Sequence, residues 1–350
     1  MKPKIIGAAI LAATAVLTGI FLMFGKTAQV TVLSGYLGGE KTGLFEDEEI
    51  AAYIKKKYNL EFDYSRAGSL DMVTAELSGR NYLFPSSQTA LEYYNEVHVG
   101  AKSDEIVFNT PIVLYSHKAV AEALSAQGIV TRTDGVYYAD MVKLAELILN
   151  EKQWSDIGLP QLYGSVCVDT TDPARSNSGN MFAALLANSL NGGKTVDTGS
   201  INEILPKLKR IFERTGYMET SSSDLFNQFL RMGVGAKPII AGYESQIIEY
   251  ATENPAEYAK IKDDIVVIYP TPTIWSAHIY IALDDSGKSG IEALTDTKVQ
   301  ELAWKKHGFR TSNYAGLNGN SPVSGILESV ISVINMPSYD VMKRIIDELS

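Results

Sequence analysis

The chain has 350 residues, a formal net charge of −10 at pH 7 and 45% hydrophobic residues. The acidic balance argues against nucleic acid as a partner, and a single cysteine excludes an intramolecular disulfide and a cysteine-based metal cage. A chain of this length can form two lobes of about 150 residues each that fold by ordinary core burial.

The first predicted element is a membrane anchor or signal segment within residues 1–29. An apolar run at residues 5–24 contains no charge, follows Lys2 and Lys4, and is long enough to span a bilayer. No small-residue cleavage site follows it clearly, which favours an uncleaved anchor over a cleaved signal peptide. The flanking lysines predict that the amino end lies inside the cell and that the remaining residues are extracytoplasmic.

Strand-like runs then alternate with amphipathic helical stretches, which predicts an α/β fold with mainly parallel strands. A unit of strand, small polar loop and helix recurs three times. The expected strands span 30–33, 60–64 and 82–84, and the helices that follow them span 45–58, 70–77 and 89–96.

Small polar residues follow each of these three strands. Ligands in open α/β sheets bind at the carboxyl ends of the strands, where successive loops meet helix N-termini. The residues expected there, and therefore candidates for ligand binding, are Ser34, Ser69, Ser86 and Ser87.

A second candidate site lies in the middle of the chain, where a polar loop precedes a helix that starts near Ser176, Asn177 and Ser178. The first N–H groups of a helix have no internal partner and favour an anion or a polar solute. Simple N-capping by Ser176 or Ser178 explains the same residues equally well.

Two arginines lie close to these loops and are candidate bidentate anion clamps. Arg66 precedes Ser69, and Arg175 directly precedes Ser176. The alternative is that they pair with nearby acids, Arg66 with Asp63 and Arg175 with Asp172.

Signals for other chemistry are weak. Residues 35–42 approach a phosphate-binding loop, but Glu40 stands where glycine is required before Lys41. No nucleophile elbow occurs, and the histidines lack the spacing of zinc ligands, so each is interpreted as a surface or structural residue. We therefore expect neither an enzyme nor a bound metal or cofactor. The histidines are His98, His117, His278 and His307.

Several short motifs carry a resemblance to a known family. They are Ser34-Gly35, Ala67-Gly68-Ser69-Leu70, Pro85-Ser86-Ser87, the stretches 108–114 and 172–179, and Gly242-Tyr243-Glu244-Ser245. Together with the order of elements over residues 30–310, they resemble the type 2 periplasmic solute-binding proteins of ABC transporters, particularly the molybdate- and tungstate-binding branch.

The resemblance implies two lobes joined by two crossing strands, with a solute held between them. The first lobe would comprise residues 30–112 and 276–350, and the second residues 113–275. The serines after the early strands would line one wall of the cleft, and Ser176, Asn177 and Tyr243 would face them.

These residues fit two opposite charges of the solute. Hydroxyl groups and helix N–H groups suit an oxyanion, because they are directed donors. Glu244 would repel an anion unless it bonds a donor, and together with Asp172 and Tyr243 it fits a cation instead.

These features predict an extracytoplasmic solute-binding protein that captures a small ligand, an oxyanion by preference, for an ABC-type permease. The alternative is a membrane-anchored ligand-sensing or scaffold module that reports to a neighbouring membrane protein. The apolar run at residues 5–24 favours this alternative more than it favours a freely diffusing receptor.

Overall fold

The computed structural model describes residues 30–311 and 321–350. The expected membrane segment at residues 5–24 lies outside these ranges. Within them, every helix is too short or too polar to cross a bilayer.

The strands of the described chain join into one ten-stranded sheet. They are β1 (Thr31–Leu37), β2 (Leu60–Arg66), β3 (Tyr82–Phe84), β4 (Ser103–His117), β5 (Val130–Thr133), β6 (Val136–Asp140), β7 (Ile239–Tyr243), β8 (Ile265–Thr271), β9 (Trp275–Ala282) and β10 (Arg310–Thr311). Their order is β2-β1-β3-β9-β4-β8-β6-β5, with β7 and β10 also paired to β4.

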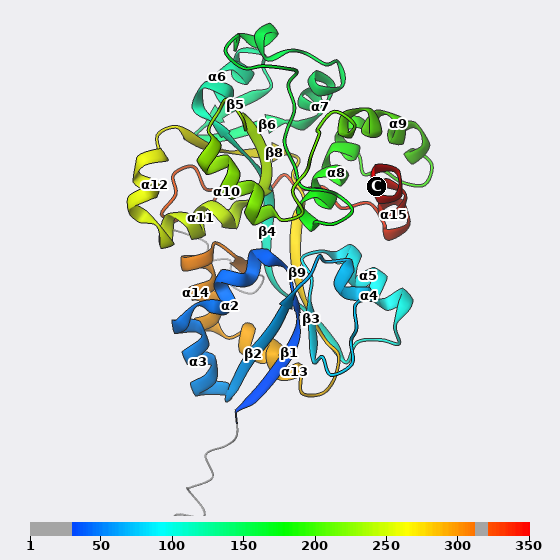
Figure 1. Ribbon diagram of the computed structural model, residues 1–350, viewed down its shortest axis with the longest axis vertical. Helices are drawn as coiled ribbons and strands as arrows, with labels where there is room; N and C mark the ends of the chain where they lie inside the picture. Colours follow the sequence, from blue (N-terminus) through cyan, green and yellow to red (C-terminus); the bar gives the residue numbers. More distant parts are fainter. Residues whose placement is uncertain (1–29, 312–320) are drawn as a thin grey trace, which may run out of the picture.

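Helices pack around this sheet in two lobes, one above the other in Figure 1. Those of the lower, first lobe are α2 (Thr42–Glu46), α3 (Glu48–Tyr58), α4 (Asp71–Thr74), α5 (Gln88–Val97), α13 (Lys288–Leu294) and α14 (Thr297–His307). Those of the upper, second lobe are α6 (Lys118–Ala126), α7 (Met141–Leu149), α8 (Asn177–Leu190), α9 (Ile201–Phe212), α10 (Ser222–Met232), α11 (Glu244–Glu253) and α12 (Pro255–Ile261). Short 3-10 turns lie at Gly39–Lys41 and Trp154–Ile157.

The long strand β4 belongs to both lobes. Its first part pairs with β9 in the first lobe, and its last residues pair with β7 and β8 in the second. Residues from Val107 to Tyr115 are almost all buried, which explains why this stretch reads as a continuous apolar run. All of the β4 pairings are antiparallel, so the sheet is mixed and not mainly parallel as expected; β1 pairs in parallel with β2 and β3, and β6 with β8.

Local sequence signals explain the better-predicted helices. The Asp47 side chain accepts hydrogen bonds from the backbone N–H groups of Glu49 (2.9 Å) and Ile50 (3.0 Å), which caps α3. Three lysines in the last turn suit the negative end of the helix dipole. Asn59 then ends the helix in the left-handed conformation, with φ 55°.

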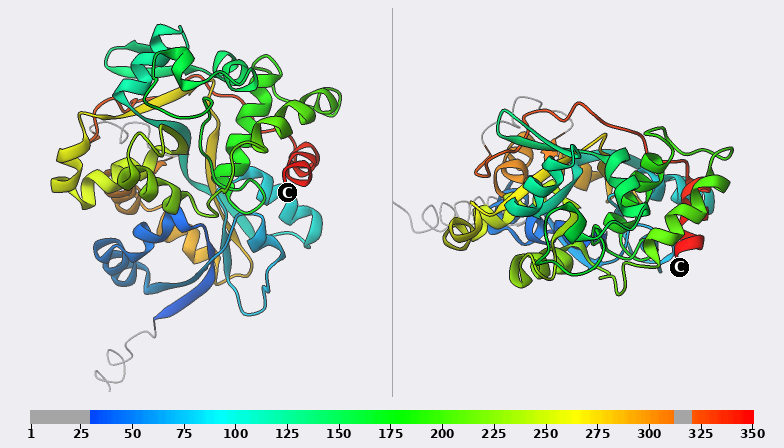
Figure 2. Two further views of the ribbon diagram at one scale, coloured as in Figure 1. Left: turned by 45° about the horizontal axis from the view of Figure 1, so that its top comes forward. Right: turned by 90° about the horizontal axis from the view of Figure 1, so that it is seen from above.

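The C-terminal helix α15 (Tyr339–Leu349) contacts both lobes, as its position beside α8, α9 and α5 in Figures 1 and 2 shows. Its buried face, which includes Met342 and Ile345, joins the core of the second lobe. The Tyr339 ring stacks on Tyr93 of α5, with centroids 4.9 Å apart. We expected all of residues 276–350 in the first lobe, but the apolar face of α15 is buried mainly against the second.

Candidate solute-binding site

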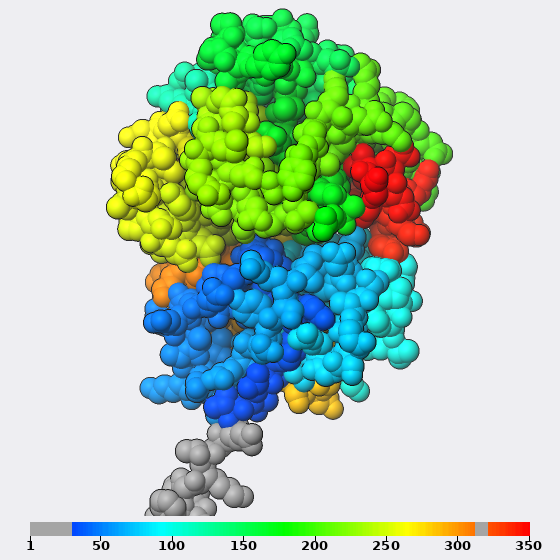
Figure 3. Space-filling model, in the orientation of Figure 1, coloured from blue at the N-terminus to red at the C-terminus, as the bar shows by residue number. Residues whose placement is uncertain are grey.

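A polar cleft of about 490 Å³ lies between the two lobes. Figure 3 shows the boundary along which the lobes meet on one face of the molecule. The first lobe contributes the loops after β1 and β2, and the second contributes the start of α8, the loop before α10 and the end of β7. The charged residues that line the cleft are Glu40, Arg66, Asp71, Arg175 and Asp224.

The two arginines face this cleft from opposite lobes. Arg66 ends β2 and Arg175 immediately precedes the cap of α8; both side chains are exposed. Within residues 30–311 and 321–350, neither guanidinium has an ion-pair or hydrogen-bond partner, so the predicted pairing with Asp63 or Asp172 does not form. Two unpaired guanidinium groups in one cleft favour an anionic ligand.

The start of α8 is not explained by simple capping. Ser176 occupies the N-cap position, but its side chain makes no capping hydrogen bond. Its Oγ instead lies 3.1 Å from Ser178 Oγ, which is 2.7 Å from Thr171 Oγ1. Ser176 lines the cleft, whereas Ser178 is buried behind it. The N–H groups in the first turn of α8 therefore face the cleft, and the serine side chains do not cap them.

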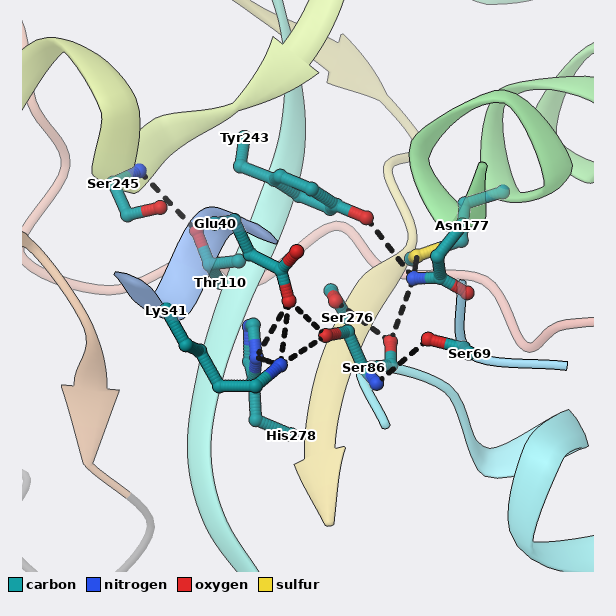
Figure 4. Close-up of polar contacts among 11 residues, drawn as sticks. Glu40, Lys41, Ser69, Ser86, Thr110, Asn177, Tyr243, Ser245, Ser276 and His278 are labelled. Carbon is teal, nitrogen blue, oxygen red and sulfur yellow. Dashed lines mark hydrogen bonds and ion pairs between the residues drawn. The ribbon is translucent and has the colours of Figure 1, made fainter. Parts of the chain in front are cut away.

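Asn177 connects the two lobes (Figure 4). Its side-chain Nδ2 donates to the Ser86 carbonyl oxygen (2.8 Å) in the first lobe and to the Tyr243 hydroxyl (3.0 Å) in the second. A Cβ added to Gly68 would lie only 2.8 Å from the carbonyl oxygen of Arg175. The absence of a side chain at Gly68 therefore allows the loops of the two lobes to touch, and the structure is a closed arrangement.

A buried ionic cluster lies beneath the cleft and includes Glu40 and Lys41 of the 3-10 turn that follows β1 (Figure 4). The Lys41 ammonium lies 2.5 Å from Glu40 Oε1, 2.5 Å from Ser86 Oγ and 3.1 Å from His278 Nδ1. The Ser86 hydroxyl also donates to Glu40 Oε1. Lys41 and His278 are both 0% exposed. A fully buried lysine is tolerated here because three partners surround its ammonium.

The charge states of this cluster follow from its contacts. Burial alone would raise the pKa of Glu40, but the charges of Lys41 and His278 and hydrogen bonds from Lys41 and Ser86 outweigh burial and lower that pKa to about 2. Burial and the Lys41 ammonium hold the pKa of His278 well below its usual range. Glu40 is therefore ionised at neutral pH, and Lys41, whose pKa is lowered by burial against the opposing charge of Glu40, donates a hydrogen bond to the neutral His278 ring.

Four of the predicted serines lie outside the cleft lining: Ser178, which is buried behind it, and three serines in or after the early strands. Ser34 lies within β1, where its Oγ contacts Asp63 Oδ2 (3.2 Å) and accepts from Arg80 (2.8 Å). It misses the cleft because β1 continues to Leu37 and does not end at residue 33. Ser86 is fully buried beneath the cleft, and Ser87 is the N-cap residue of α5.

Glu244 is also not brought into the cleft. It is 0% exposed, and its carboxylate pairs with Arg310, with Nε 2.6 Å from Oε2 and Nη2 2.9 Å from Oε1. The Tyr269 hydroxyl donates to the same carboxylate. The charge of Glu244 is thus neutralised inside the protein, and it neither repels an anion nor attracts a cation in the cleft. The predicted residues that do line it are Arg66, Ser69, Arg175, Ser176, Asn177 and Tyr243.

Sequence reasoning missed part of the second wall and the buried cluster. Thr220, Ser221 and Asp224, at the start of α10, line the cleft, and Ser221 caps that helix. A polar triplet before an amphipathic helix is a signal that could have indicated them. In the sequence, Glu40 stands out only because it conflicts with a phosphate-binding loop.

Ser69 has a structural role as well as a place in the cleft. Its Oγ accepts a hydrogen bond (3.0 Å) from the buried backbone N–H of Ser86. We expect Ser69→Ala to lower the free energy of unfolding by about 1–3 kcal/mol, because it leaves that N–H without a partner. Urea denaturation measures this. The matched control is Ser87→Ala, which removes a buried hydroxyl that has no hydrogen-bond partner in the described chain; equal losses in both variants would contradict the assigned role.

No protein-family profile and no curated protein matches the sequence. Solved structures do match its fold. The periplasmic binding protein AfuA from Actinobacillus pleuropneumoniae, with fructose-6-phosphate bound, is 15% identical with a TM-score of 0.59, over 91% of this chain and 97% of AfuA. The sulfate-binding protein SubI from Mycobacterium tuberculosis H37Rv is 14% identical with a TM-score of 0.54, over 87% of this chain and 93% of SubI.

A periplasmic thiamin-binding protein is 10% identical with a TM-score of 0.60, over 91% of this chain and 95% of that protein. The chain therefore has the two-lobed fold of periplasmic solute-binding proteins. These similar structures include proteins for a sugar phosphate, sulfate and thiamin, so the likeness extends well beyond the molybdate and tungstate branch.

Proposed function

We propose that the chain is an extracytoplasmic solute-binding protein that holds a small anionic solute between its lobes for an ABC-type permease. The observation that carries this proposal is the pair of unpaired arginines, Arg66 and Arg175, on opposite walls of one cleft. An anionic group that contacts both guanidiniums is bound best when the lobes are together. Binding would therefore shift the population towards the closed form that a permease recognises.

The size and charges of the cleft favour an organic anion over a bare oxyanion. Its volume of about 490 Å³ is in the range of small-molecule sites, about 300–1,000 Å³, and a bare oxyanion would leave most of it empty. Glu40, Asp71 and Asp224 also line it and can accept hydrogen bonds from hydroxyl groups of a solute. A polyol with one phosphate, sulfate or carboxylate group fits both the two arginines and these three carboxylates.

The test is a thermal-shift and calorimetric screen of the purified full chain. We expect fructose-6-phosphate or another phosphorylated or carboxylated polyol to raise the melting temperature, since a ligand at 100 times its Kd stabilises the folded state by about 2.7 kcal/mol. Neutral fructose is the matched control, and sulfate, phosphate and molybdate test the bare oxyanions. An equal shift with fructose, or no shift with any anion, would contradict the proposal; the second result would favour a membrane-anchored scaffold or sensing module.

A further inference from the structure

A second group of charged side chains lies outside the cleft, where α11 of the second lobe meets α14 of the first. Glu249 and Glu253 are four residues apart on α11 and so share one face of that helix. His307 is the last residue of α14. One ligand atom from each of these three residues lies within 4.8 Å of the others.

The imidazole of His307 is buried between carboxylates. It is 2% exposed, and its Nδ1 lies 2.6 Å from Glu249 Oε1. The other nitrogen, Nε2, makes no hydrogen bond and lies 3.5 Å from Asp47 Oδ2. The ring thus presents Nδ1 to Glu249 on α11 and Nε2 to Asp47.

Negative charge exceeds positive charge around this ring. Three carboxylates, those of Asp47, Glu249 and Glu253, face one ammonium, that of Lys306, which lies 2.8 Å from Asp47 and is shared with Glu49 at 3.1 Å. A divalent cation would offset this excess.

The backbone of α2, in the first lobe, approaches the cluster closely. A Cβ added to Gly43, in α2, would lie 2.3 Å from Glu249 Oε1. The Glu249 carboxylate therefore lies directly against the α2 backbone, in the space that a side chain at position 43 would enter.

We propose that Glu249, Glu253 and His307 form a binding site for a divalent transition-metal ion, with zinc as its representative. Two carboxylate oxygens and one imidazole nitrogen are a donor set that suits zinc and its neighbours. Asp47 lies at the far ring nitrogen, where a carboxylate orients a metal-bound imidazole and raises its basicity. Because the donors come from α11 and α14, the ion would join the two lobes at a place separate from the cleft.

The proposal is tested on the full chain, stripped with a chelator and then titrated with ZnCl₂ against a chromophoric zinc indicator. We expect one zinc per chain, and a loss of affinity of about tenfold or more in both His307→Gln and Glu253→Gln. The matched control is Glu257→Gln, which removes an exposed carboxylate that pairs with Lys260 on α12; it should bind zinc as the wild type does.

Binding of cobalt(II) gives a second readout, because its visible absorption reports nitrogen and oxygen donors directly and should vanish in His307→Gln. Circular dichroism of each variant shows whether it is folded, and Glu249→Gln replaces any variant that is not. Absence of stoichiometric zinc in the wild type, or unchanged affinity in the folded variants, overturns the proposal. No anionic solute is present in this titration, so its outcome is independent of the proposed function of the cleft.

Discussion

Lys41→Met is expected to lower the free energy of unfolding by about 3–5 kcal/mol at pH 7, the cost of leaving a buried charge without its partner. Methionine has a similar length, so the change removes the ammonium without opening a large cavity. The Glu40 carboxylate then remains in a buried site with only the Ser86 hydroxyl and the neutral His278 nearby. Urea denaturation monitored by circular dichroism measures the loss.

The pH dependence separates lost charge compensation from lost packing. In the wild type the pKa of Glu40 is lowered to about 2, below its unfolded value, so its contribution to stability is present above about pH 4.5 and is lost as the pH falls towards 2. In Lys41→Met, burial raises the pKa of Glu40, so protonation at mildly acidic pH relieves the variant. The difference between the two proteins should therefore shrink on acidification from pH 7.

A double variant supplies the control. Glu40→Gln with Lys41→Met removes both charges, and replacing both partners of a buried pair costs far less than removing one. We expect the double variant to be more stable than Lys41→Met alone. If the double variant is equally unstable and the deficit does not change with pH, the lysine contributes packing and the charge argument is wrong.

The α/β fold class and helix α3 could be predicted because they depend on patterns along the chain. The apolar run within β4, the Asp47 cap of α3 and the small polar loops after early strands are local signals. The boundaries of short strands depend on pairing with distant strands more than on the local sequence. β1 extends to Leu37 because it pairs with both β2 and β3, and this tertiary pairing moved Ser34 from a loop into a strand.

The misplaced charges share one physical cause. Glu244 is neutralised by Arg310, 66 residues further along the chain. The charge of Lys41 is balanced by the adjacent Glu40, but its burial depends on contacts with Ser86 and His278, 45 and 237 residues away. A charged residue next to a cleft motif looks solvent-facing until its partner is known, and partners at such separations leave no pattern in the sequence. Arg66 and Arg175 could be expected at the cleft because they lie beside the predicted cleft loops and have no distant partner in the described chain.

Removal of the two arginines is expected to abolish most solute binding while sparing the fold. A hydrogen bond to a charged group contributes about 1.5–3 kcal/mol, so Arg66→Ala and Arg175→Ala should each weaken the affinity for an anionic solute by about tenfold to a hundredfold. Both guanidiniums are exposed and unpaired in the described chain, so the free energy of unfolding should stay within about 0.5 kcal/mol of the wild type.

Calorimetry at constant ionic strength measures these affinities, because salt screens exposed charges. Arg175→Lys keeps the charge but loses the planar fork, so it should bind better than Arg175→Ala and worse than the wild type. The matched control is Arg132→Ala, which removes an exposed arginine on β5 that stacks on Tyr137 outside the cleft lining. If Arg132→Ala weakens binding as much as Arg175→Ala, only the net charge of the protein matters and the clamp is not in the cleft. A selective loss at positions 66 and 175 with full stability places the anionic group of the solute between the two lobes.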